Sequence, residues 1–156
     1  MLIEIKEVRK QIEEIWPWFK RHPDELVFWD LKYYWAIPEA QVGQLIAKSS
    51  IPEMIYVPQF NDCDNYSLQA QAETRRKRYL AYMKLRESGA DIPEEFKYPL
   101  LVAMAFGNMF RGKSENHKAN LFVCDEGIYM ADFMPMEKRH WKASAENDNL
   151  FKINFA

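Results

Sequence analysis

Glycine is scarce in this sequence, with only five in 156 residues. None of them falls in the spacing of a Walker phosphate loop or of a dinucleotide-binding fingerprint, whose glycines let the backbone approach phosphate groups. This scarcity excludes nucleotide binding through either of those two loops.

Long apolar runs and a strong excess of one charge are also missing. No apolar stretch approaches the roughly 20 residues that a membrane-spanning helix needs, and the charged start, with Glu4, Lys6 and Glu7, is unlike a secretory signal. A formal charge of −2 and a pI near 6.0 argue against a dedicated nucleic-acid binder. The two cysteines, Cys63 and Cys124, could pair, but without an export signal we expect a reducing, cytoplasmic location and no membrane partner.

Hydrophobic residues make up 48% of the chain and aromatic residues 15%, which is enough for a core of its own. We therefore expect a single domain over residues 1–156. It would consist of a helical, aromatic-rich N-terminal portion (1–52) and a core (53–156). Helical patterns come first and strand patterns last, with one long helix between them, so the sequence predicts an α+β fold with a central helix on an antiparallel sheet.

The spacing of apolar residues sets the expected elements, because helices repeat every 3.6 residues and strands alternate. Proline at position 38 suits the first turn of a helix, and the aromatic run 28–35 is expected to be partly extended. The predicted helices span 4–15, 38–48 and 63–86, the predicted strands span 54–58, 100–106, 117–123, 128–133 and 150–155, and 107–115 and 135–149 are expected to be loops.

The segment 61–65, Asn-Asp-Cys-Asp-Asn, places a thiol where an extended run becomes a helix. A cysteine in the first helical turn faces free backbone N–H groups and the positive end of the helix dipole, which favours its thiolate. The neighbouring carboxylates of Asp62 and Asp64 oppose this effect unless they cap the helix or hold a cation. The segment is therefore a candidate nucleophilic site, although a free cysteine is also commonly a small buried apolar residue.

A cysteine nucleophile needs a histidine and a third group that orients the imidazole. His117 is expected to open a strand, after a loop. In a hairpin with an even-numbered loop near 124–127, Asp132 lies on the same face as His117 and diagonal to it. Asp132 is therefore the candidate orienting acid, with Glu137 in reserve.

An oxyanion donor is needed as well, and the candidates are the Cys63 backbone N–H and the side chains of Gln59 and Asn61. Among the metal alternatives, Asp62 and Asp64 could hold a cation. A zinc site from Cys63, Cys124, His117 and His140 lacks paired ligand spacing.

Two further patterns have open interpretations. The basic run Arg75-Arg76-Lys77-Arg78 lies inside the predicted central helix, where it forms either a solvated face or a contact to phosphates. The aromatic residues of the first third form either core or an exposed patch for a partner; they are Trp16, Trp18, Phe19, Phe28, Trp29, Tyr33, Tyr34 and Trp35.

The segments 61–68, 117–120 and 130–132 resemble the papain-like cysteine peptidase domain that is fused to a fungal ricin-type agglutinin, and small phage-encoded proteins related to it. In that family a cysteine opens the central helix, a histidine opens a strand and an acid follows on the next strand. The resemblance implies that Cys63 is the nucleophile, His117 the general base and acid, and Asp132 the orienting acid. The family commonly has glutamate where this chain has Asp132.

The resemblance also implies a function. It predicts a cysteine hydrolase or acyl transferase that acts on peptide amides, with calcium held near Asp62 and Asp64 and with a peptide or protein as substrate. A phage-encoded relative would act in the host cytoplasm. The alternative is a protein on the same scaffold that performs no catalysis and binds or inhibits a host protein through the aromatic patch.

Overall fold

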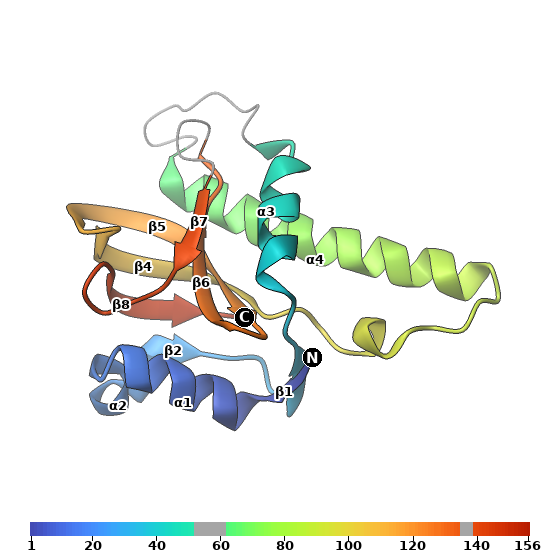
Figure 1. The fold of residues 1–156 in the computed structure, drawn as a ribbon, viewed down its shortest axis with the longest axis horizontal. Helices are drawn as coiled ribbons and strands as arrows, with labels where there is room; N and C mark the ends of the chain where they lie inside the picture. Colours follow the sequence, from blue (N-terminus) through green and yellow to red (C-terminus); the bar gives the residue numbers. More distant parts are fainter. Residues whose placement is uncertain (52–61, 135–138) are drawn as a thin grey trace.

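The computed structural model describes residues 1–51, 62–134 and 139–156 (Figure 1). Its helical elements are α1 (Ile5–Ile15), α2 (Trp18–Arg21), η1 (Pro23–Glu25), α3 (Glu39–Ala47), α4 (Cys63–Glu87) and η3 (Glu94–Lys97). Its strands are β1 (Leu2–Glu4), β2 (Leu26–Val27), β3 (Tyr33–Trp35), β4 (Val102–Phe110), β5 (Lys113–Cys124), β6 (Gly127–Asp132), β7 (Arg139–Lys142) and β8 (Asn149–Asn154).

Six strands form the main sheet in the order β2-β8-β4-β5-β6-β7, and β1 pairs with β3 in a small second sheet. Strands β4 to β7 are successive antiparallel neighbours, and β8 lies antiparallel to β4 on their other side. The sheet is mixed because β2 runs parallel to β8. The predicted α+β class, with a central helix on the sheet and helices at the N-terminus, is confirmed.

The central helix α4 begins where the sequence places a cap. The Asp62 carboxylate accepts a hydrogen bond from the Asp64 N–H at 3.2 Å, which satisfies one of the unpaired donors of the first turn. Neither glycine nor proline interrupts the following 25 residues. The helix ends at Glu87, and Gly89 then adopts a positive φ of 70°, a common way to terminate a helix.

The two faces of the sheet have separate cores. One face packs against α1 and α2, where Val8, Ile12 and Phe19 are fully buried. The other face packs against α3 and the first half of α4, where Val42 and Ala70 are fully buried. Burying apolar area at about 25 cal/mol per Å² makes these two layers the main source of stability.

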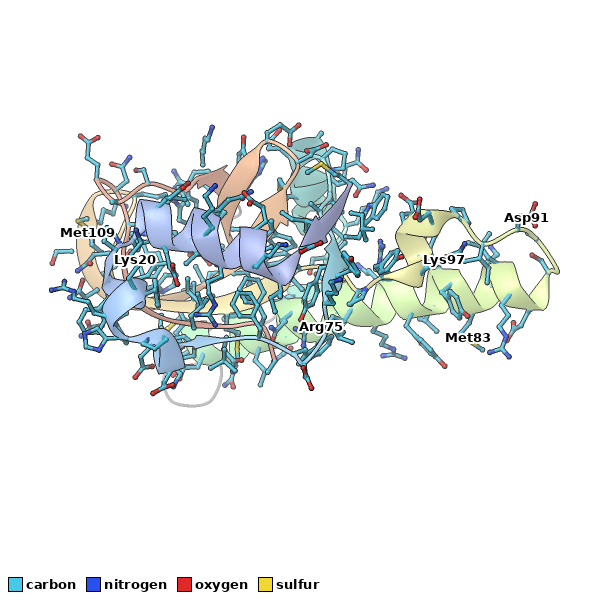
Figure 2. The ribbon with its side chains drawn as sticks, turned by 90° about the horizontal axis from the view of Figure 1, so that it is seen from below. Lys20, Arg75, Met83, Asp91, Lys97 and Met109 are labelled. Carbon is cyan, nitrogen blue, oxygen red and sulfur yellow. The ribbon has the colours of Figure 1, made fainter. Side chains whose placement is uncertain are left out.

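The second half of α4 extends past the sheet. Figure 2 shows this half, which carries Met83, running beside the returning chain that holds Asp91 and Lys97. No residue of α4 after Thr74 is buried, and every residue of this helix is described. We call α4 from Arg75 onward, together with residues 88–98, the arm.

Most predicted elements are confirmed, including the three helices, the hairpin of β5 and β6, and the final strand. The loop predicted over 107–115 is wrong. Strands β4 and β5 continue into this region and turn at Arg111 and Gly112, which have positive φ values of 52° and 73°. Strand β7 was missed inside the region 135–149, and the strand predicted over 54–58 lies outside the described residues. None of the described helices could cross a membrane.

Candidate active site

Cys63 is the first residue of α4 and is half-buried. Its N–H belongs to the first turn, whose donors have no acceptor within the helix. It lines a pocket of about 150 Å³ whose walls come from α4, β4, β5 and β8. The residues that line this pocket are Cys63, Asp64, Phe106, Gly107, Asn116, His117, Lys118 and Phe151.

His117 lies inside β5, opposite Gly107 of β4. The prediction that it opens a strand is therefore wrong, because the hairpin extends beyond it to Lys113. A register shift between Gly107 and Met109 lets the two strands continue past this point. The pairing of β5 with β4 at this point thus positions the imidazole.

Asp132, the last residue of β6, meets His117 directly. The His117 Nε2 and the Asp132 Oδ2 are 2.7 Å apart, and both side chains are largely buried. Val123 opposes Ile128, and the loop has the predicted even length, which keeps His117 and Asp132 on one face. The other oxygen, Oδ1, accepts a hydrogen bond from the Met134 N–H at 2.9 Å, which fixes the carboxylate.

The environment of His117 favours the protonated ring. Burial lowers the pKa of His117, but its hydrogen bonds to Asp132 and to the Cys63 side chain outweigh burial and raise the pKa to about 10. Because Nε2 is paired with Asp132, the other ring nitrogen, Nδ1, is left for the sulfur. The geometry therefore brings Cys63, His117 and Asp132 together.

A lysine that the sequence analysis missed compensates one of the flanking carboxylates. The Lys118 ammonium forms an ion pair with Asp64, whose Oδ1 lies 3.6 Å from the Cys63 sulfur. The positive charge offsets the repulsion that Asp64 would exert on a thiolate. Lys118 follows His117 in β5, so only knowledge of how β5 packs on α4 could have identified it.

The two carboxylates predicted to hold calcium have other partners. Asp62 caps α4 and Asp64 pairs with Lys118. Within 1–51, 62–134 and 139–156, no three histidine, cysteine or acidic side chains gather as metal ligands. Because calcium takes six to eight oxygen ligands, these two residues do not by themselves make a calcium site, and calcium stays a prediction.

The sequence also did not predict a role for Gly107, which forms the pocket wall opposite His117. A Cβ at this position would lie 2.6 Å from the Asn149 carbonyl oxygen and 3.0 Å from Leu150 and Phe110 side-chain atoms. Such close approach leaves room only for glycine. The Phe110 ring meets the His117 ring edge-on at 5.3 Å and packs the imidazole from the core side.

The remaining candidates are either apart from this site or outside the described residues. Cys124 is buried in the core, where burial raises the pKa of its thiol to about 12, and His140 pairs with Glu39. The three predicted residues outside the described part of the chain are Gln59, Asn61 and Glu137.

The basic run of α4 does not form a free cationic stripe. Arg75 and Arg78 donate hydrogen bonds to backbone carbonyls, and Lys77 pairs with Glu73. The eight aromatic residues of the first third are mainly core: Trp16, Phe19 and Tyr34 are buried, and Trp18, at 36%, is the most exposed.

No protein-family model and no characterised protein sequence matches the chain. Solved structures do match it. The Polyporus squamosus lectin bound to the human-type influenza-binding epitope Neu5Aca2-6Galb1-4GlcNAc superposes with a TM-score of 0.65 at 12% identity, over 99% of this chain and 49% of that one. A complex of PSL1a with E64 superposes with a TM-score of 0.64 at 16% identity, over 99% of this chain and 51% of that one.

These similarities establish the fold. The chain has the papain-like α+β fold, with a long helix packed on a mixed six-stranded sheet, and shares it with the two fungal-type structures. It spans about half the length of the chains that it matches.

Proposed function

We propose that the protein is a papain-like cysteine hydrolase or acyl transferase that acts on peptide amides. The observation that carries this proposal is the contact chain from Cys63 through the His117 ring to Asp132, at a pocket that reaches the surface. Nucleophile, base and orienting acid in this order are the parts that thiol acyl transfer needs.

In the first half of the reaction, the Cys63 thiolate attacks the amide carbonyl carbon, and the carbonyl π electrons move onto the oxygen. The Cys63 backbone N–H, in the first turn of α4, is the proposed donor to this oxyanion. The intermediate collapses to a thioester as the C–N bond breaks, and the leaving amine takes a proton from the His117 imidazolium.

In the second half, neutral His117 accepts a proton from water, and the resulting hydroxide attacks the thioester carbonyl. A primary amine in place of water would give acyl transfer. The C–S bond then breaks, and the carboxylic acid is released while the thiolate and imidazolium re-form. Asp132 holds the ring in one orientation throughout, because its second oxygen is anchored on the Met134 N–H.

Binding without catalysis, through an aromatic patch, has less support. The aromatic residues named for it are largely buried or half-buried. The exposed aromatic nearest the candidate site is Phe151, which is 45% exposed and lines the same pocket. Its position fits a wall that receives an apolar side chain of a bound peptide.

Thiol reactivity tests the proposal within one molecule. We expect iodoacetamide to alkylate Cys63 rapidly at about pH 6, as followed by intact mass and peptide mapping, because an adjacent imidazolium stabilises the thiolate. Cys124 is the internal control and stays unmodified, since it is buried with a pKa of about 12.

Variants link this reactivity to function. We expect His117→Ala to slow alkylation at least tenfold and Cys63→Ala to abolish cleavage of a peptide library read by mass spectrometry. Arg76→Gln, an exposed position on the far half of α4, should change neither. Alkylation of equal rate in the wild type and His117→Ala would contradict the proposal.

A further inference from the structure

A second and larger pocket lies between the arm and the body of the protein. It encloses about 570 Å³, within the range of sites for small organic ligands. Five aromatic side chains contribute to its walls: Trp29, Tyr79, Tyr82, Phe96 and Tyr98. Figure 2 shows the two sides of the arm, α4 and the returning chain, and residues of both line the pocket.

Two arginines line this pocket, and the groups that accept their hydrogen bonds are neutral backbone carbonyls. Arg75 stacks on the Trp29 ring at 4.1 Å, and its Nη2 donates to the carbonyls of Val102 and Phe155. The Arg75 Nε is buried without a hydrogen-bond acceptor among the described residues.

Arg78 is held in a similar way. It stacks on the Phe96 ring at 5.1 Å, and its Nε and Nη2 both donate to the Tyr98 carbonyl oxygen at 3.2 Å. The pocket lining includes a third cation, Lys97, and no carboxylate.

The charge on the two guanidinium groups is therefore incompletely compensated. Burial lowers the pKa of Arg75 and of Arg78, which reflects their loss of hydration. The negative charge of Glu95, which lines a neighbouring pocket, raises the pKa of Arg78 and so partly offsets the effect of burial. An anion that reached this pocket would supply charge-assisted hydrogen bonds that the carbonyl groups do not.

We propose that this pocket binds a small apolar carboxylate, with a single carboxylate group on an aromatic or aliphatic body. The body packs against Tyr79, Tyr82 and Phe96, and the carboxylate pairs with Arg78. Free organic acids and the C-terminus of a peptide that ends in an apolar residue share this chemistry. The site is separate from the candidate active site, because Arg78 lies 15 residues along α4 from Cys63, roughly 22 Å at 1.5 Å per residue.

A matched pair of ligands tests the proposal on the unmodified protein. By calorimetry, we expect 2-naphthylacetate to bind at least tenfold more tightly than 2-naphthylacetamide, which has the same body without the charge. A short peptide ending in phenylalanine, with a free or an amidated C-terminus, distinguishes the two sources. Equal affinity for the acid and the amide, or no binding of any acid at millimolar concentration, would overturn the proposal.

Variants then locate the site. Arg78→Gln should remove the preference for the acid, whereas Arg76→Gln, a neighbouring arginine that lines a different pocket, should leave it unchanged. Tyr82→Ala should weaken the acid and the amide alike, since it removes part of the apolar wall. Alkylation of Cys63 should not alter binding. A loss of preference in Arg76→Gln equal to that in Arg78→Gln would place the anion elsewhere.

Discussion

The two halves of α4 differ in how much of their surface is buried. The first half lies on the sheet and buries Tyr66, Ser67, Ala70, Gln71 and Thr74. The second half buries none of its residues and exposes large apolar side chains, with Tyr79 at 59% and Leu80 at 52%. Figure 1 shows the first half against the strands and the second half reaching beyond them.

This contrast shows how one helix can hold a candidate catalytic residue in a fixed position at one end and line an open pocket at the other. At the first end, sheet hydrogen bonds and side-chain hydrogen bonds such as that from the Ser67 hydroxyl to the Ala119 carbonyl (3.0 Å) fix the position of Cys63. At the second end, Arg75 stacks on Trp29 of the N-terminal part and Arg78 stacks on Phe96 of the returning chain, and both arginines line an open pocket. The same type of substitution should therefore lower the free energy of unfolding more near the candidate active site than in the arm.

The largest difference is expected for carboxylates. Asp132→Ala should lower the free energy of unfolding by about 3 kcal/mol, because it strands a buried imidazolium that would then have to lose its proton. Asp91→Ala, on the exposed loop of the arm, should change it by less than about 0.5 kcal/mol. Urea unfolding measures both, and similar losses would break the comparison.

Measuring the free energy of unfolding at a series of pH values tests the contribution of His117 to the stability of the candidate active site. The pKa of His117 is raised from 6.5 to about 10 in the folded protein, so its stabilising contribution is fully present below about pH 6.5 and is lost as the pH rises through about 10. The stability difference between the wild type and His117→Gln should shrink across that window. We expect a smaller effect than for Asp132→Ala, since the variant keeps the Asp132 bond to Met134. A difference that is constant with pH would contradict the raised pKa.

Glycines give the smallest of the three effects. Gly107→Ala should cost about 1–3 kcal/mol, because the new Cβ meets the Asn149 carbonyl oxygen at 2.6 Å. Gly89→Ala, at the end of the arm, has nothing within 4 Å and should cost about 1 kcal/mol from its positive φ alone. Denaturant midpoints for the two variants check this order, and the reverse order would show that the β4 backbone yields more easily than its packing indicates.

Local patterns were enough to predict much of the fold. The cap at Asp62, the uninterrupted helix after it and the parity of the β5–β6 hairpin all depend on residues close in sequence. Parity made Asp132 the candidate partner of His117 for any loop of even length, with Glu137 in reserve, because a two-residue shift of register keeps side chains on one face.

Contacts between distant segments could not be predicted in this way. The ion pair from Lys118 to Asp64 and the close approach of Gly107 to Asn149 depend on how α4 and β8 pack on the sheet. The loop expected over 107–115 was wrong for a different, local reason, since the polar residues there belong to a hairpin that extends into solvent. The predicted domain extent and calcium binding remain predictions.

The parallel pair of β2 and β8 ties the order of assembly to the order of synthesis. Leu26 and Val27 form their ladder with Ile153 and Asn154, so the first strand of the main sheet along the chain has no sheet partner until the last strand of that sheet is made. Contacts of such long sequence separation slow folding. A ribosome-bound chain would therefore hold β2 without its ladder partner until the other strands of the main sheet have been made, a window in which a chaperone could act on it.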